Sequence, residues 1–116
     1  LRRRPEARWR RRPEDLDVLV PLQRALVGAA VDLVRPGGVV VYATCSPVLA
    51  ETRDVLGSLL VARDDVTLGD SRALMTTEAG LRADVPDCDG PLDGTVQLWP
   101  HRHRTDAMFL AVLRKR

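Results

Sequence analysis

Apolar residues recur at intervals of three or four between Asp15 and Val34, which is the spacing of one face of an α-helix. They are Leu16, Leu19, Leu22, Leu26, Ala30 and Leu33. Pro21 predicts a break in this helix or the first turn of its main segment. The sequence Arg35-Pro36-Gly37-Gly38 ends the helix and turns the chain. We therefore predict an amphipathic helix that packs this stripe against a core.

A run of β-branched and other apolar residues over 39–43 follows the turn. Because polar residues do not alternate with the apolar ones, we predict a strand that is covered on both faces, as in a parallel sheet. A second helix is predicted to continue to about Arg63. Its N-cap is Ser46, and Pro47 takes the first helical position, where a missing N–H has no cost.

Three shorter apolar runs predict further strands, which cover Val66–Leu68, Val96–Trp99 and Met108–Leu113. Residues 69–94 are rich in Gly, Asp and Pro, so we expect a long surface loop with one helical turn. This order of helices and strands favours an α/β fold. Only Val66–Leu68 is a clear parallel partner for strand 39–43, which needs a strand on its other side as well. We therefore expect residues 1–116 to be the carboxyl-terminal part of a larger sheet.

Charge is segregated along the chain, although the net charge is only +2. Residues 1–12 carry seven Arg and one Glu, residues 64–93 carry eight acids and two Arg, and residues 94–116 carry five basic residues and one Asp. We interpret residues 1–13 as a basic arm and expect a polyanion to bind at the two ends of the chain. The basic residues are almost all Arg, which suits bidentate phosphate contacts; a GC-rich genome would favour the same composition.

The composition excludes two classes of protein. No apolar stretch approaches the ~20 residues of a membrane span, and no apolar segment follows the basic arm, as a secretory signal would require. Cys45 and Cys88 are far apart in sequence, and a disulfide between them is one alternative. We expect a reduced pair in a cytoplasmic protein.

Thr44-Cys45-Ser46-Pro47 places a cysteine at the carboxyl end of the predicted strand 39–43, on the turn into a helix. In open α/β sheets this rim is where ligands bind. The positive end of a helix dipole would favour a thiolate there. Cys45 is therefore a candidate nucleophile, and the alternative is a small buried residue that ends a strand.

Four motifs, in order, resemble the RsmB/Sun (Fmu) branch of the ribosomal RNA cytosine-5 methyltransferases, which are of the RsmB/NOP type. Residues 2–9 resemble a segment of the form Arg-Arg-His-Pro-Asp-x-Lys-Trp, and Leu22-Gln23-Arg24 is the second match. The third runs from Leu33 to Pro47 and includes Glu51. The fourth is Pro100-His101 with Asp106-Ala107-Met108-Phe109, which resembles Pro-His…Asp-Gly-Phe-Phe. The resemblance is least specific over residues 64–95.

This resemblance implies a Rossmann-like fold that binds S-adenosylmethionine, with a mixed sheet and a terminal antiparallel strand. It implies that Cys45 adds to C6 of a cytosine in 16S ribosomal RNA, which makes C5 nucleophilic enough to accept a methyl group. The cytosine must then be unstacked or single-stranded. In this context we expect Arg2, Arg3 and Arg8 to contact RNA. Thr44 and Ser46 would shape the turn, and Glu51 would lie one turn into the helix.

Several functional parts of that family lie before the point at which this sequence starts. They are the glycine-rich cofactor loop, the ribose-binding acid and the Asp-Ala-Pro-Cys motif. We therefore expect no cofactor-binding residue within 1–116, and no activity from this segment alone. Cys88 lies in Asp-Cys-Asp-Gly, an unfavourable place for a reactive thiol, so we interpret it as structural. Ala107 and Met108 replace Gly-Phe and are expected to repack near the last strand.

Two other functions stay open. One is a non-catalytic RNA-binding module that uses the basic termini. The other is a different thiol enzyme such as a phosphatase, which is disfavoured because no glycine-and-arginine phosphate cradle follows Cys45. His101 and His103, with only Asp106 nearby in sequence, are thin evidence for a metal site, and we expect none. The sequence does not indicate the target nucleotide or the oligomeric state.

Overall fold

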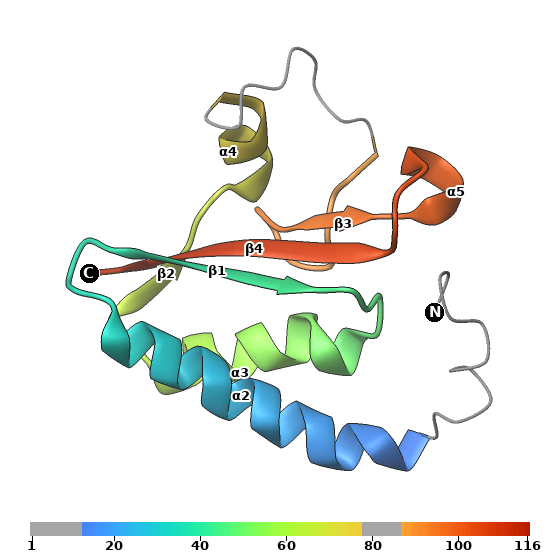
Figure 1. Ribbon diagram of the computed structural model, residues 1–116. Coiled ribbons are helices and arrows are strands. Elements are labelled where there is room, and N and C mark those ends of the chain that lie inside the picture. Colours follow the sequence, from blue (N-terminus) through green and yellow to red (C-terminus); the bar gives the residue numbers. More distant parts are fainter. Residues whose placement is uncertain (1–12, 78–86) are drawn as a thin grey trace.

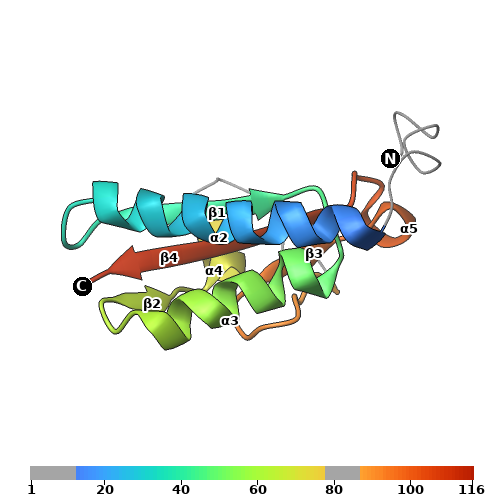
Figure 2. The ribbon, with the colours of Figure 1, turned by 90° about the horizontal axis from the view of Figure 1, so that it is seen from below.

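A four-stranded sheet with two long helices on one face organises the chain (Figure 1). The computed structural model describes residues 13–77 and 87–116. In chain order the elements are η1 (Pro13–Asp15), α2 (Leu16–Leu33), β1 (Val39–Thr44), η2 (Leu49–Glu51), α3 (Arg53–Ala62), β2 (Val66–Leu68), α4 (Ser71–Thr77), β3 (Val96–Leu98), α5 (Pro100–His103) and β4 (Met108–Lys115). Helices α2 and α3 lie side by side beneath the sheet (Figures 1 and 2), and α4 lies on the opposite face.

Strand β4 is the centre of the sheet. On one side it pairs with β1, from Val39 opposite Arg114 to Thr44 opposite Phe109. On its other side it pairs with β3 near its start and with β2 near its end. All three pairings are antiparallel, so β1, β2 and β3 share one direction and β4 runs against them. This confirms the predicted α/β class with an antiparallel terminal strand. It corrects the expected pairing of β1 with β2, because β4 lies between them.

The core lies between the sheet and the two helices. Its buried members are Val27 and Val31 of α2, Val55, Leu56 and Leu59 of α3, and Val66, Phe109, Ala111 and Leu113 of the sheet. The predicted stripe on α2 is wrong, since Leu26 is 61% exposed and Leu33 is 88% exposed. Apolar residues form two adjacent stripes along α2, so their spacing alone could not identify the buried stripe. The residues that pack in the core are valines that each follow the predicted stripe by one position, such as Val27 after Leu26.

Two further predictions about α2 and β1 need correction. Pro21 lies inside α2 and does not break it. Strand β1 is not covered on both faces by the described residues, because Val39, Val41 and Ala43 are exposed and alternate with the half-buried Val40, Tyr42 and Thr44. Among the described strands β1 is at the edge of the sheet. Its apolar residues on the outer face therefore have no cover from this part of the chain.

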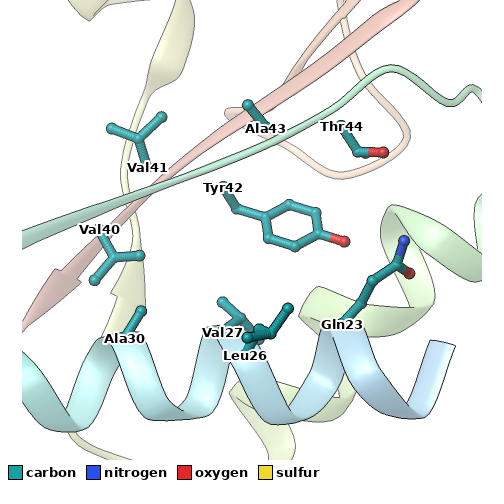
Figure 3. A pocket seen from close by; sticks show the side chains of 9 residues that line it. All are labelled: Gln23, Leu26, Val27, Ala30, Val40, Val41, Tyr42, Ala43 and Thr44. Carbon is teal, nitrogen blue, oxygen red and sulfur yellow. The ribbon is translucent and has the colours of Figure 1, made fainter. Parts of the chain in front are cut away.

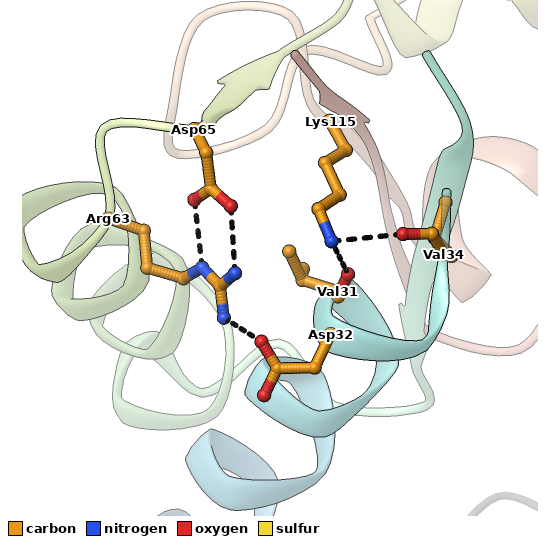
Figure 4. A network of polar contacts seen from close by, with 6 residues as sticks. All are labelled: Val31, Asp32, Val34, Arg63, Asp65 and Lys115. Atoms are coloured by element: carbon orange, nitrogen blue, oxygen red, sulfur yellow. Dashed lines mark hydrogen bonds and ion pairs between the residues drawn. The ribbon is translucent and has the colours of Figure 1, made fainter. Parts of the chain in front are cut away.

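The turn after α2 forms where it was predicted. Gly37 has a φ of +83°, in the left-handed region that glycine adopts without steric cost. Its N–H donates to the carbonyl of Lys115 at 2.8 Å. The ammonium of Lys115 in turn donates to the carbonyls of Val31 and Val34, each at 3.0 Å (Figure 4). These carbonyls have no further helical turn to donate to them, so Lys115 caps α2 and connects it to β4.

Arg63 joins the ends of α3 and α2 (Figure 4). Its Nε and Nη2 donate to the two carboxylate oxygens of Asp65 at 2.9 and 2.8 Å, and its Nη1 donates to Asp32 at 2.6 Å. Hydrogen bonds from Arg63 hold the pKa of Asp65 below its usual value. The hydrogen bond to Asp65, and then that to Asp32, raises the pKa of Arg63. The cluster is exposed enough for salt to screen it.

Asp65→Asn is expected to make the melting temperature fall less steeply as the pH is lowered into the acid range. A carboxyl group whose pKa is lowered by folding stabilises the fold above its unfolded pKa, near 4, and this contribution is lost as the pH falls through the folded pKa. The melting temperature of the parent should therefore fall more steeply than that of Asp65→Asn below about pH 4. Thermal unfolding at a series of pH values measures this. Asp64→Asn, one residue away and exposed, is the matched control. Parallel curves for the parent and Asp65→Asn would contradict the expectation.

Candidate active site

Cys45 is the first residue after β1, and its side chain is exposed. Its thiol donates to the thioether sulfur of Met108, the first residue of β4, at 3.4 Å. The register that pairs Thr44 with Phe109 brings these two strand ends together. Sequence reasoning expected Met108 to repack near the last strand and missed its contact with Cys45. Neither Cys45 nor the buried Cys88 forms a disulfide bond.

The segment after Cys45 returns to the helical layer through a compact turn. The hydroxyl of Ser46 accepts from the N–H of Val48 at 3.1 Å, and the hydroxyl of Thr52 donates to the carbonyl of Val48 at 3.0 Å. The 3₁₀ turn η2 lies between them. Serine hydroxyls commonly stabilise turns in this way. Local hydrogen bonds therefore stabilise the turn that follows the strand end.

This turn corrects the predicted start of the second helix. Helix α3 begins at Arg53, so Ser46 is not its N-cap and Pro47 is not its first residue. Val48 has an extended ψ of 125°, which interrupts any helix that starts at Pro47. The influence of a helix dipole falls off within the first turn. Activation of Cys45 by the N-terminus of α3 is therefore not supported.

Glu51 is buried, with 6% of its surface exposed, and lies at the far end of this turn. Its Oε1 accepts from the Nε2 of Gln23 on α2 at 3.1 Å. Its backbone carbonyl accepts from the hydroxyl of Tyr42 on β1 at 2.6 Å. Burial, and then the charge of Glu51, raises the pKa of Tyr42. Sequence reasoning noted Gln23 and Glu51 separately but missed that they form a pair.

A hollow lies between α2 and the open edge of β1 (Figure 3). Its volume is about 290 Å³ and its lining is mostly apolar, formed by Gln23, Leu26, Val27, Ala30, Val40, Val41, Tyr42, Ala43 and Thr44. The Oε1 of Gln23 is buried and has no hydrogen-bond partner among the described residues. A carboxylate can only accept hydrogen bonds, so Glu51 contacts the amide nitrogen of Gln23. The amide oxygen of Gln23 is therefore the end of the amide that does not contact Glu51.

The other predicted residues do not join this site. Arg2, Arg3 and Arg8 lie outside the described residues. The carbonyl of Cys88 accepts from the N–H of Gln97 at 2.8 Å beside β3, in agreement with a structural role. The Nδ1 of His103 accepts a hydrogen bond from the backbone N–H of Trp99 at 2.9 Å. The ring centroids of His101 and Trp99 are 5.8 Å apart.

Residues 13–77 and 87–116 contain no group of three or more His, Cys, Asp or Glu side chains that could hold a metal ion. None of their helices has both the length and the apolar character needed to cross a membrane.

Comparison with known protein families shows to which family this chain belongs. The family model described as 16S rRNA methyltransferase RsmB/F matches residues 1–114. The chain belongs to this family. A similar protein of Mycobacterium tuberculosis is named provisionally as a methyltransferase. The two are 55% identical, over 99% of this chain and 23% of the relative.

Other relatives carry more specific names. A Synechocystis protein named as a probable ribosomal RNA small subunit methyltransferase B is 33% identical, over 99% of this chain and 24% of the relative. A Salmonella paratyphi B protein named ribosomal RNA small subunit methyltransferase B is 37% identical, over 61% of this chain and 17% of the relative. The chain thus spans about a quarter of the length, or less, of these curated relatives.

Solved structures agree on the fold. The crystal structure of PH0851 superposes with a TM-score of 0.80 at 34% identity, over 96% of this chain and 22% of the other. NSun6 from Pyrococcus horikoshii, solved with SFG, gives a TM-score of 0.71 at 24% identity, over 90% of this chain and 24% of the other. The second likeness shows the fold alone. Together with the family match, these findings confirm both the resemblance drawn from the sequence and the predicted fold class.

Proposed function

We propose that this chain is the carboxyl-terminal part of the catalytic domain of a cytoplasmic RNA cytosine-5 methyltransferase. Its substrate is a cytosine in small-subunit (16S) ribosomal RNA, its methyl donor is S-adenosylmethionine, and its nucleophile is Cys45. Membership of the RsmB/F family and the names of two relatives support an rRNA substrate. The observation that carries the choice of nucleophile is the exposed thiol of Cys45 at the carboxyl end of β1.

The proposed chemistry needs a nucleophile because C5 of cytosine is a poor acceptor for a methyl group. The thiolate of Cys45 forms a bond to C6, and the electron pair of the C5–C6 double bond makes C5 nucleophilic. C5 would take the methyl group of S-adenosylmethionine, which would leave as S-adenosylhomocysteine, and C5 would then lose its proton to water. The double bond then re-forms, the C6–S bond breaks, and the thiolate of Cys45 leaves. Covalent catalysis thus divides one difficult step into easier ones.

The lining of the hollow beside β1 does not favour S-adenosylmethionine as its ligand. The hollow beside β1 has an apolar lining with Gln23, Tyr42 and Thr44 as its polar side chains, and no acid that could bind the ribose hydroxyls. The strand-to-helix turn after β1 runs through Ser46 and Pro47 and contains no glycine. We therefore place the donor site in residues that precede this chain in the longer protein.

Charge supports RNA as the partner. Residues 1–12 carry seven Arg and one Glu, and Arg2, Arg3 and Arg8 are the RNA contacts that we propose. The beginning of α2 lies at the same end of the fold as the return after β1 and as α5 (Figures 1 and 2). The exposed Arg102 and Arg104 lie in and just after α5. Two basic segments therefore join the fold at the end that carries Cys45.

The direct test is methylation by the full-length protein. An unmodified 16S rRNA transcript is incubated with the protein and methyl-labelled S-adenosylmethionine, and the labelled nucleosides are then separated. We expect 5-methylcytidine, and no label in a 23S rRNA transcript used as control. Label in any other nucleoside would contradict cytosine-5 chemistry. Tight RNA binding without transfer would favour the non-catalytic RNA-binding module.

A further inference from the structure

Glu51 is a buried carboxylate that the proposed chemistry does not use. A buried charge is costly unless hydrogen bonds compensate it. The compensation here comes from the side-chain amide of Gln23, which lies 28 residues earlier on another helix. Such a pair favours one arrangement of the two segments, because the buried carboxylate of Glu51 would lose this hydrogen bond if the half-buried Gln23 moved away.

The pair lies at the end of the turn that begins with Cys45. Within that turn the hydroxyls of Ser46 and Thr52 bind the backbone of Val48. At Glu51 the turn is bound from two directions, because Tyr42 on β1 donates to its carbonyl and Gln23 on α2 donates to its carboxylate. The residues between Cys45 and α3 are thus held at Glu51 by the sheet and by the helical layer.

We propose that Gln23 and Glu51 are positioning residues for the nucleophile: their hydrogen bond fixes the 46–52 turn and thereby the place of the Cys45 thiol at the strand end. The inference rests on the proposed function for its catalytic consequence. Neither side chain touches the reacting atoms. A displacement of about 1 Å at a reacting group can reduce a rate by about 100-fold. Loss of the Gln23–Glu51 hydrogen bond would therefore slow methylation by letting the turn, and with it the Cys45 thiol, move.

The test compares Gln23→Leu and Glu51→Gln in the full-length protein. Gln23→Leu keeps the approximate size and removes the donor, so the carboxylate stays buried without its partner. We expect kcat for methylation of 16S rRNA to fall roughly 10- to 100-fold, with KM for the RNA changed less than about twofold. Glu51→Gln keeps the shape and an acceptor for Gln23, and should retain kcat within about threefold.

Ser71→Ala is the matched structural control. The hydroxyl of Ser71 is buried and accepts from the N–H of Val112 at 3.0 Å, on the α4 side of the sheet. Its loss also leaves a buried group without a partner, so this variant should be less stable while its kcat is unchanged. If Ser71→Ala and Gln23→Leu lower kcat equally, the effect is general destabilisation, and the positioning role is wrong.

Hydrogen exchange separates this inference from the proposed function, because it needs neither RNA nor donor. In Gln23→Leu we expect the backbone N–H groups of Glu51 and Thr52 to exchange at least about tenfold faster than in the parent or in Ser71→Ala. Unchanged exchange would overturn the positioning role whether or not the protein methylates RNA. Faster exchange with unchanged kcat would overturn its catalytic consequence. If the parent fails to methylate, the proposed function fails and the exchange result alone decides whether the pair fixes the turn.

Discussion

Cys45→Ser is expected to lower methylation of 16S rRNA by the full-length protein at least about 1,000-fold, or about 4 kcal/mol of transition-state stabilisation. The hydroxyl of serine has nearly the shape of the thiol, but it is a far weaker nucleophile at neutral pH. The side chain is exposed at the strand end, so the substitution should leave the fold intact. Initial rates with methyl-labelled S-adenosylmethionine measure the loss, and thermal unfolding shows whether stability is retained.

A trapping experiment tests the covalent step itself. RNA with 5-fluorocytidine in place of cytidine cannot lose a proton from C5, so the C6–S bond persists and the complex survives denaturing electrophoresis. We expect this complex with the parent and with Cys88→Ala, and none with Cys45→Ser. Cys88 is buried beside β3 and serves as the control for the other thiol. A trapped complex with Cys45→Ser, or one that is lost with Cys88→Ala, would assign the nucleophile elsewhere.

Leu56→Ala is expected to lower the free energy of unfolding by about 2–5 kcal/mol, because it removes a buried side chain and leaves a cavity. Leu56 is completely buried on α3, within the cluster that also contains Val31 and Phe109. Phe109 also makes an edge-to-face contact with Tyr42, with ring centroids 6.1 Å apart. Urea unfolding of the full-length protein, followed by circular dichroism, measures the change.

The same substitution at Leu33 provides the matched comparison. Leu33 is 88% exposed, so Leu33→Ala should change the free energy of unfolding by less than about 0.5 kcal/mol. Leu33→Ala also tests which face of α2 is buried, since the apolar spacing assigned Leu33 to the core. Equal losses for the two variants would mean that a part of the longer protein covers Leu33.

The elements of the fold could be predicted from sequence where the signal is local. The Pro-Gly-Gly turn and the strands at 66–68, 96–98 and 108–115 form close to where composition placed them. The buried face of α2 could not be predicted, because Leu26 and Val27 are equally apolar and only their contacts with the sheet distinguish them. The start of α3 was missed because Ser46 and Pro47 suit a tight turn as well as a helix N-terminus.

The site was predictable only in part. A motif after an apolar run made Cys45 the candidate nucleophile; the structure places its thiol exposed at the strand end, and its catalytic role stays a prediction. The contact with Met108 could not be predicted without the register of β1 and β4, which are more than 60 residues apart. The pairing of Gln23 with Glu51 likewise depends on how α2 and the 46–52 turn approach each other. Both are contacts of tertiary structure that no local pattern encodes.

The open edge of β1 has a practical consequence for anyone who handles this segment by itself. Among residues 13–77 and 87–116, no strand pairs with the outer edge of β1, and Val39 and Val41 are exposed beside it. Such an edge is a template on which another strand can assemble. In the longer enzyme that we propose, the preceding part of the sheet would occupy this edge. Produced without it, the 116 residues should form insoluble aggregates on concentration, so a negative activity result from them would reflect their state in solution rather than their chemistry.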